Sequence, residues 1–182
     1  ARIKDSKVRW LEIDPLQSYE IQEIDTASAL LRTDIDIIIG AHISGVCEAE
    51  LKKHLGDRCK GDDDRVSRPD ILVKVGEESG LAIWAPVDIK SHKAISDSKS
   101  NSIFSSPISN ILPAQDAKEE GRLDYNDLHQ LAHYTRHFQA LGIAGDDLWV
   151  GIIGREFEVC VWSRIGDVVM GQGQAQESFL SV

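Results

Sequence analysis

The sequence is short of cysteine, of long apolar runs and of positive charge, and each shortage excludes a class of protein. Its three cysteines are too few and too scattered for a disulfide framework, a cysteine-based zinc site or a four-cysteine iron–sulfur cluster. No apolar run reaches the roughly 18 residues of a membrane helix. The opening residues do not show the pattern of a secretory leader. We therefore expect a reduced, cytoplasmic protein with no membrane association and no iron–sulfur cluster.

The formal net charge of −10 argues against a protein that coats nucleic acid by bulk attraction. A local site that binds phosphates through a metal ion and a few cations is compatible with this charge. Hydrophobic residues make up 42% of the chain and charged residues 27%, so its 182 residues can bury the core of a globular domain. We expect one domain over residues 1–182, as a fragment of a longer protein.

Strand and helix patterns alternate along the chain, which predicts an α/β fold. The most distinct pattern is a hairpin, with strands over 70–76 and 81–90 and a turn at "EESG". The segment "DYNDLHQLAHYTRHFQALG", residues 124–142, has apolar residues at helical spacing and a glycine where the helix should stop. Two more strands are expected at 147–154 and 156–162.

Other segments have weaker patterns. Residues 7–14 are expected to form a first strand, and 26–42 a helix that runs into a buried segment. A short surface helix is expected at 47–55. Serine recurs through 91–110 without clear periodicity, which predicts a long mobile loop.

Two acidic residues and a lysine mark the ends of the hairpin. Asp70 opens the first strand, and Asp88 and Lys90 close the second. Because the strands are antiparallel, Asp70 and Asp88 should meet at one edge of the sheet, where two carboxylates repel unless a cation lies between them. Mg²⁺ and Mn²⁺ prefer such oxygen ligands, and the backbone carbonyl of Ile89 is near enough to be another. Lys90 would point at the same site, where it could position or deprotonate a water, or stabilise charge on a phosphate.

A simple ion pair is the alternative. Asp88 and Lys90 share one face of a strand and could form a salt bridge at its end, with Asp70 a turn residue after Pro69. For an isolated Asp-x-Lys this interpretation would prevail, because the tripeptide is common. The ordered combination of Pro-Asp, strand, turn, strand and Asp-x-Lys favours a functional site.

This ordered set resembles the signature of the PD-(D/E)XK nuclease superfamily, here Pro69-Asp70 and Asp88-Ile89-Lys90. The segment "QLAHY" adds Gln130 and Tyr134 in an arrangement similar to the QxxxY motif of the RecB-type branch. The resemblance implies a restriction-endonuclease-like core, with a central mixed sheet flanked by helices. It also implies an exonuclease-like hydrolysis of DNA phosphodiester bonds that depends on Mg²⁺ or Mn²⁺ and serves DNA repair.

The resemblance also assigns roles within the site. It gives metal binding to Asp70 and Asp88, catalysis to Lys90, and substrate contact to Gln130 and Tyr134. Lys93 and Arg136 are cations that could touch backbone phosphates. RecB-type relatives also use an early His or Glu as a metal ligand, and His42 leads because it ends an apolar segment before the hairpin. The remaining candidates are Glu20, Glu23 and Glu48.

Two other functions remain open. The chain could be a catalytically silent nuclease-like module that binds nucleic acid or a partner protein, such as another domain or subunit of a larger nuclease. His129 and His133 could instead bind zinc, although Gln130 stands where a zinc protease helix carries Glu. With His137 they are expected to form a solvated or DNA-facing helix edge. The three aspartates at 62–64 are expected to be solvated surface.

Overall fold

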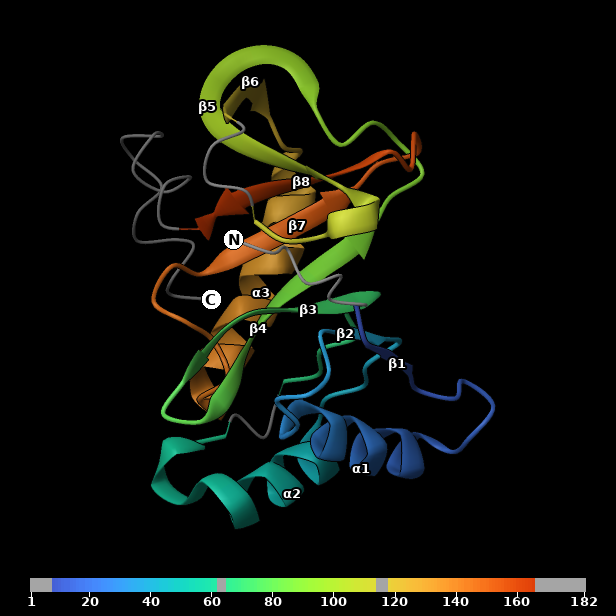
Figure 1. Cartoon of the computed structure of the whole chain (residues 1–182), viewed down its shortest axis with the longest axis vertical. Helices are drawn as coiled ribbons and strands as arrows, with labels where there is room; N and C mark the ends of the chain where they lie inside the picture. The colour runs from blue at the N-terminus through green and yellow to red at the C-terminus, as the bar shows by residue number, and fades with distance from the viewer. Residues whose placement is uncertain (1–7, 62–64, 114–117, 166–182) are drawn as a thin grey trace, which may run out of the picture.

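The computed structural model describes residues 8–61, 65–113 and 118–165. These residues form an eight-stranded mixed sheet with helices packed against it (Figure 1). The strands are β1 (Trp10–Glu12), β2 (Ile37–Ile39), β3 (Ile71–Glu78), β4 (Leu81–Ile89), β5 (Ser96–Pro107), β6 (Lys118–Arg122), β7 (Trp149–Ile153) and β8 (Val159–Arg164). The helices are α1 (Tyr19–Leu30), α2 (Gly45–Leu55) and α3 (Tyr125–Leu141), with 3₁₀ turns η1 (Gly56–Arg58) and η2 (Ile108–Asn110).

The sheet order is β1-β2-β3-β4-β7-β8-β5-β6. The pairs β1–β2 and β4–β7 are parallel, and the other neighbouring pairs are antiparallel. In Figure 1, α3 crosses behind β4, β7 and β8, whereas α1 and α2 lie together near β1 and β2. The expected α/β class with a mixed sheet flanked by helices is therefore confirmed, as are the hairpin and the two strands that follow the long helix.

Both faces of the sheet are buried. On one face, Leu30 of α1, Leu51 of α2 and Phe138 of α3 belong to a single apolar cluster with Leu72 and Trp84 of the hairpin. On the other face, a smaller cluster joins the central strands to the turn that follows β5. As a result, β4 is buried on both sides along nearly its whole length. A polar side chain at the end of such a strand needs a specific partner.

Local sequence determines both ends of α3. The carboxylate of Asp124 accepts a hydrogen bond from the backbone N–H of Asn126 at 2.8 Å, and Gly142 follows the helix with a left-handed φ of 71°. A Cβ atom at Gly142 would lie 2.8 Å from the backbone oxygen of Arg58. Glycine is therefore needed at this stop for both conformational and steric reasons. The helix expected over 124–142 is confirmed.

The helix expected over 26–42 was wrong. Helix α1 begins earlier, at Tyr19, and ends at Leu30. Residues Ile37–Ile39 form β2, which pairs with β1 on one side and with β3 on the other. Three successive β-branched side chains favour an extended backbone, and the sheet supplies partners on both sides. The chain therefore changes from helix to strand inside the segment expected to be one helix.

The loop expected over 91–110 was also wrong. This serine-rich segment contains β5 and η2, and β5 pairs with both β6 and β8. Ile103 and Phe104 are buried, and Ser106 accepts a hydrogen bond from Nε1 of Trp162 at 2.8 Å. Serine has no strong strand preference of its own, so the pairing comes from neighbours distant in sequence. The aspartates at 62–64 lie outside the described residues.

Candidate active site

The hairpin brings Asp70 and Asp88 to the same end of the sheet. Ile71 of β3 pairs with Val87 of β4, so the two aspartates follow directly at the next position on each strand. The Oδ2 atom of Asp70 accepts a hydrogen bond from the backbone N–H of Ile89 at 2.7 Å. This end is also where β4 and the parallel strand β7 finish, the edge at which open α/β sheets place their ligand sites.

Asp88 is an enclosed carboxylate with one close cation. Its residue is 2% exposed, and its Oδ2 atom lies 3.1 Å from Nζ of Lys90. Burial raises the pKa of Asp88, the contact with Lys90 opposes that effect, and the charge of Asp70 adds to it, with a net rise. A carboxylate held in this way favours a nearby positive charge beyond the lysine alone.

The ammonium group of Lys90 joins the hairpin to α3. Its Nζ atom donates to Oε1 of Gln130 at 2.8 Å and lies 3.5 Å from Oδ1 of Asp127. Burial alone would lower the pKa of Lys90, but the contacts with Asp88 and Asp127 outweigh it, so the pKa is raised. Lys90 is therefore positively charged at neutral pH in this arrangement.

One face of α3 completes the cluster. Gln130 donates through Nε2 to the hydroxyl of Tyr134 at 2.8 Å, and that hydroxyl donates to the backbone oxygen of Arg68 at 3.2 Å. Burial raises the pKa of Tyr134, and the charges of Asp88 and Asp70 add to the rise. The spacing of four places Gln130 and Tyr134 on one helix face, where Gln130 contacts Lys90 and Tyr134 lies within the electric field of Asp88 and Asp70.

Two members of the cluster were missed by the sequence reasoning. Asp127 is buried beside Lys90, and its Oδ2 atom lies 2.8 Å from Nε2 of His92. Asp127 precedes Gln130 by three residues and so shares its helix face, which is the signal that could have revealed it. His92 follows the Asp-x-Lys motif by two residues, but only the position of α3 explains its contact.

Lys93 and Arg136, the two further cations expected to contact phosphates, lie in different places. Lys93 is exposed in the segment after β4, close in sequence to the site. Arg136 follows Tyr134 by two positions on α3, so it lies about 200° away around the helix. Arg136 therefore lies on a different face of α3 from Tyr134, and its contact with backbone phosphates stays a prediction.

His42 lies near the site but is already engaged. It is 4% exposed, and its Nε2 atom accepts from Nε of Arg68 at 3.0 Å and lies 3.9 Å from Oε1 of Glu23. Burial and the charge of Arg68 lower the pKa of His42. Glu23 in turn accepts from the first N–H groups of α2, at 3.0 and 3.2 Å. His42 and Glu23 therefore serve neighbouring groups of the fold.

Three oxygen groups remain well placed for a hard divalent cation. They are the carboxylates of Asp70 and Asp88 and the carbonyl of Ile89. The N–H of Ile89 points to Asp70, and the N–H and C=O of one strand residue point to the same side, so this carbonyl also faces Asp70. Within the described ranges, no three His, Cys, Asp or Glu side chains are gathered as a metal-binding group. Proteins usually bind Mg²⁺ through one or two carboxylates, and waters and phosphate oxygens complete the coordination.

The three histidines of α3 differ in burial: His129 and His133 are half-buried, whereas His137 faces the core. His133 contacts Nη1 of Arg65 at 3.0 Å, and His137 is completely buried. The ring of His137 lies between Oγ of Ser67, at 2.8 Å, and Oε1 of Glu48, at 2.7 Å. The expectation of a solvated or DNA-facing edge was therefore wrong for His137. This buried chain anchors the segment that leads into Asp70.

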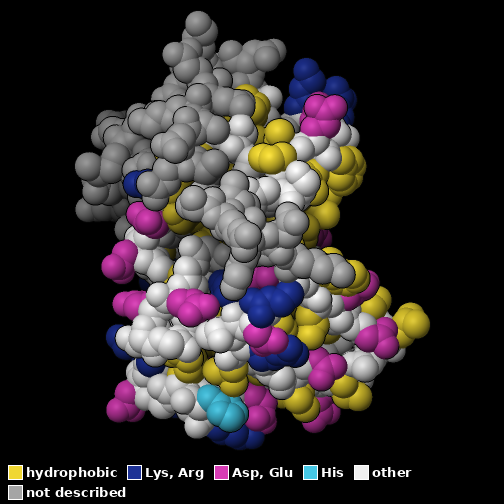
Figure 2. Space-filling view, viewed as in Figure 1, with side chains coloured by type: hydrophobic (Ala, Val, Ile, Leu, Met, Phe, Trp, Pro, Cys, Tyr) yellow, Lys and Arg dark blue, Asp and Glu magenta, His cyan; other side chains and the backbone are white. Residues whose placement is uncertain are grey.

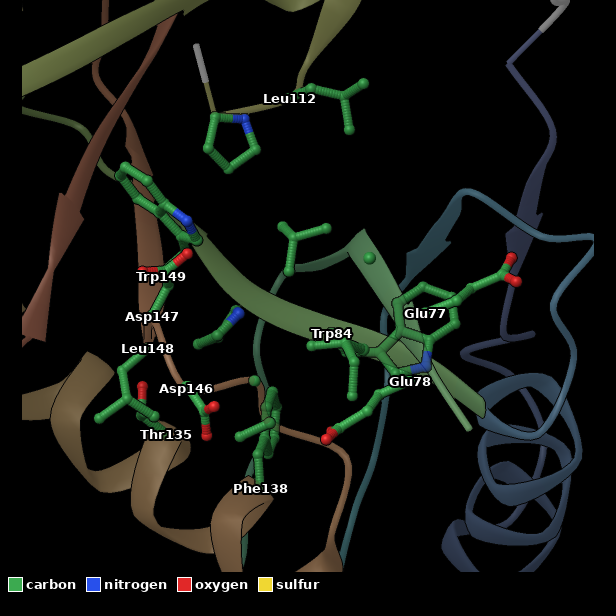
Figure 3. Close-up of a pocket in the computed structure, with 17 residues that line it drawn as sticks. Glu77, Glu78, Trp84, Leu112, Thr135, Phe138, Asp146, Asp147, Leu148 and Trp149 are labelled. Carbon is green, nitrogen blue, oxygen red and sulfur yellow. The ribbon is translucent and has the colours of Figure 1, made fainter. Parts of the chain in front are cut away.

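A cavity of about 400 Å³ lies where β4 and β7 diverge (Figure 3). Trp84, Phe138 and Trp149 contribute to its walls, and acidic residues stand around it. Two of its carboxylates already have basic partners: Glu78 pairs with Arg58 at 3.2 Å, and Asp147 lies 3.8 Å from Arg164. The candidate active-site residues do not line it, so the two places are separate.

Charge is mixed over the face shown in Figure 2, where basic side chains lie among acidic ones. Ion pairs such as Arg9 with Asp36, at 3.4 Å, account for part of this mixture. None of the helices in the described part of the chain is long and apolar enough to cross a membrane. Comparison of the chain with models of protein families, with curated proteins and with solved structures returned no match.

Proposed function

We propose that this protein is a metal-dependent nuclease of the PD-(D/E)XK type, acting on DNA through the site at the ends of β3 and β4. The observation that carries the proposal is the convergence of Asp70, Asp88 and Lys90 with Gln130 of α3 in a single cluster. These residues come from two separate motifs, 40 positions apart at Lys90 and Gln130. A salt bridge at a strand end would not need the helix.

The chemistry follows from the placement of each group. Asp70, Asp88 and the Ile89 carbonyl would hold Mg²⁺ or Mn²⁺, which supplies a Lewis acid for the phosphate and lowers the pKa of bound water. Lys90 keeps a positive charge beside the carboxylates, where it can stabilise negative charge on the phosphate under attack. Gln130 accepts from Lys90 and donates to Tyr134, so its amide fixes the direction of the ammonium group.

Cleavage of labelled single- and double-stranded DNA with Mg²⁺, Mn²⁺ or EDTA tests this function. The variants Asp88→Asn and Lys90→Gln should each lose at least about a hundredfold of the metal-dependent rate. The matched controls are Asp34→Asn and Lys53→Gln, which change exposed residues outside the site and should keep the wild-type rate. Equal cutting by the wild type and both site variants would reject the proposed site.

One observation favours a second function. His42, the leading early ligand, gives its Nε2 atom to Arg68, which leaves two carboxylates for a metal ion. The chain could then be a silent module that binds nucleic acid or a partner protein. Calorimetric titration with Mn²⁺ distinguishes the two: the enzyme binds the ion through Asp88, whereas a silent module binds DNA with no dependence on the ion.

A further inference from the structure

A cavity of about 370 Å³ adjoins the candidate metal ligands. Asp70 and Ile89 form one wall, and Tyr19, His42 and Arg68 form another. Lys90 and the α3 residues of the cluster do not line it. The cavity is therefore a separate space that opens directly beside the proposed site of phosphate cleavage.

Arg68 is held rigidly at this cavity. Its Nε atom donates to Nε2 of His42 at 3.0 Å, and its guanidinium carbon lies 4.7 Å from the centre of the Tyr19 ring. Its backbone oxygen is fixed by the hydroxyl of Tyr134. Among the described residues, no partner takes the terminal N–H groups of Arg68. A guanidinium anchored through Nε presents those groups as a fork that fits phosphate oxygens.

His42 fixes the orientation of the Arg68 side chain. Because its Nε2 atom accepts a hydrogen bond from a cation, the ring is neutral and carries its proton on Nδ1. That Nδ1 atom is buried and has no hydrogen-bond partner among the described residues. A buried unpaired donor is a cost to folding, and such costs are retained mainly at functional positions. The histidine thus holds an arginine in place at the expense of its own second hydrogen bond.

We propose that this cavity binds one unpaired nucleotide next to the phosphate at Asp70 and Asp88, with Arg68 taking its phosphate group. Tyr19, which is 61% exposed, offers an aromatic surface for the base. The volume of about 370 Å³ is in the range of small-ligand sites and suits a single nucleotide. The inference rests on the proposed function and narrows its substrate to a single strand or a frayed end.

Fluorescence anisotropy with a labelled oligothymidylate, and with a blunt hairpin duplex of equal length, tests the proposal in Ca²⁺. Arg68→Gln and Tyr19→Leu should each weaken single-strand binding by about tenfold, the size expected for one charge-assisted contact or one stacked base. Arg32→Gln, which removes an exposed cation paired with Asp34, is the matched control and should bind as the wild type does. Thymidine 5′-monophosphate should displace the labelled strand from the wild type at a concentration about tenfold lower than from Arg68→Gln.

The outcomes separate this inference from the proposed function. Binding that depends on Arg68 and Tyr19, together with absence of cleavage, would support the nucleotide site and reject the nuclease. Cleavage that is unchanged in Arg68→Gln and Tyr19→Leu would support the nuclease and overturn the nucleotide site. Equal affinity for the hairpin and the single strand would also overturn it. Thermal melting of each variant shows that the comparison is made between folded proteins.

Discussion

Replacing Asp88 by Asn should remove the proposed activity while leaving the metal-free protein at least as stable as the wild type. Burial and the nearby charge of Asp70 raise the pKa of Asp88, which means that folding disfavours its ionised form. Asparagine keeps the shape of the side chain and removes that charge. Lys90 retains Gln130 at 2.8 Å and Asp127 at 3.5 Å, so its ammonium group stays paired.

The dependence on pH follows from the same shift. A folded-state pKa above the unfolded value means that the folded protein binds the proton more tightly. The contribution of Asp88 to stability is therefore fully present below the unfolded pKa and is lost as the pH rises through the folded value. In EDTA, the wild type should lose this contribution between acid and neutral pH, and Asp88→Asn should show a flatter profile.

A divalent ion should make the wild type more stable than Asp88→Asn, the reverse of the order expected in EDTA. At a Mn²⁺ concentration a hundred times the dissociation constant, binding stabilises the wild type by about 2.7 kcal/mol. For a chain of this size that corresponds to a rise in Tm of roughly 5 to 10 °C. The Asn variant should gain little, whereas Asp34→Asn, which changes an exposed carboxylate paired with Arg32, should gain as much as the wild type.

Thermal melting in EDTA and in Mn²⁺, at two pH values, measures all three effects. A loss of about 3 to 5 kcal/mol for Asp88→Asn in EDTA would refute the reasoning, because it would identify Asp88 as a structural counter-ion of Lys90. An equal Mn²⁺ shift in the wild type and Asp88→Asn would place the ion elsewhere.

Other expectations concern the scaffold around the site. His137→Leu should lower the free energy of unfolding in urea by about 3 to 5 kcal/mol, because it leaves the buried carboxylate of Glu48 without the imidazole contact. Unchanged stability would contradict a structural role for the contact between His137 and Glu48. Gly142→Ala should cost about 1 to 2 kcal/mol, because the left-handed φ and the backbone of Arg58 both oppose a Cβ, whereas Gly45→Ala, with open space at its Cβ, should cost less. The thiols of the native protein should react slowly with dithionitrobenzoate, because all three cysteines are buried and burial raises their pKa values. In urea the same thiols should react at once. Rapid labelling of the native protein would show that the core opens readily.

The sequence was most informative where the signal is local. The hairpin, α3 and its glycine stop followed from strand alternation, helical spacing and turn residues within a few positions. The meeting of Asp70 with the end of β4 followed from the same logic, since an antiparallel pair joins its two outer ends. These features depend on residues close in the chain.

The sequence was less informative where distant partners decide the outcome. The serine-rich segment is a strand because β6 and β8 lie on either side of it, and neither partner is evident in its own composition. His137 resembles a surface histidine by spacing alone, yet Ser67 and Glu48 enclose it from two other parts of the chain. Asp127 and His92 meet only because α3 packs against β4.

By itself, the sequence determined which residue types could do chemistry, and that Asp70, Asp88 and Lys90 would stand at the end of one hairpin. Backbone periodicity and hydrogen-bond pairing act over short distances, so a linear pattern records them. Only the tertiary structure decided that Lys90 points to Gln130 and that His42 supports Arg68. Those contacts depend on how helices pack on a sheet, and that packing is set by the whole core rather than by any one segment.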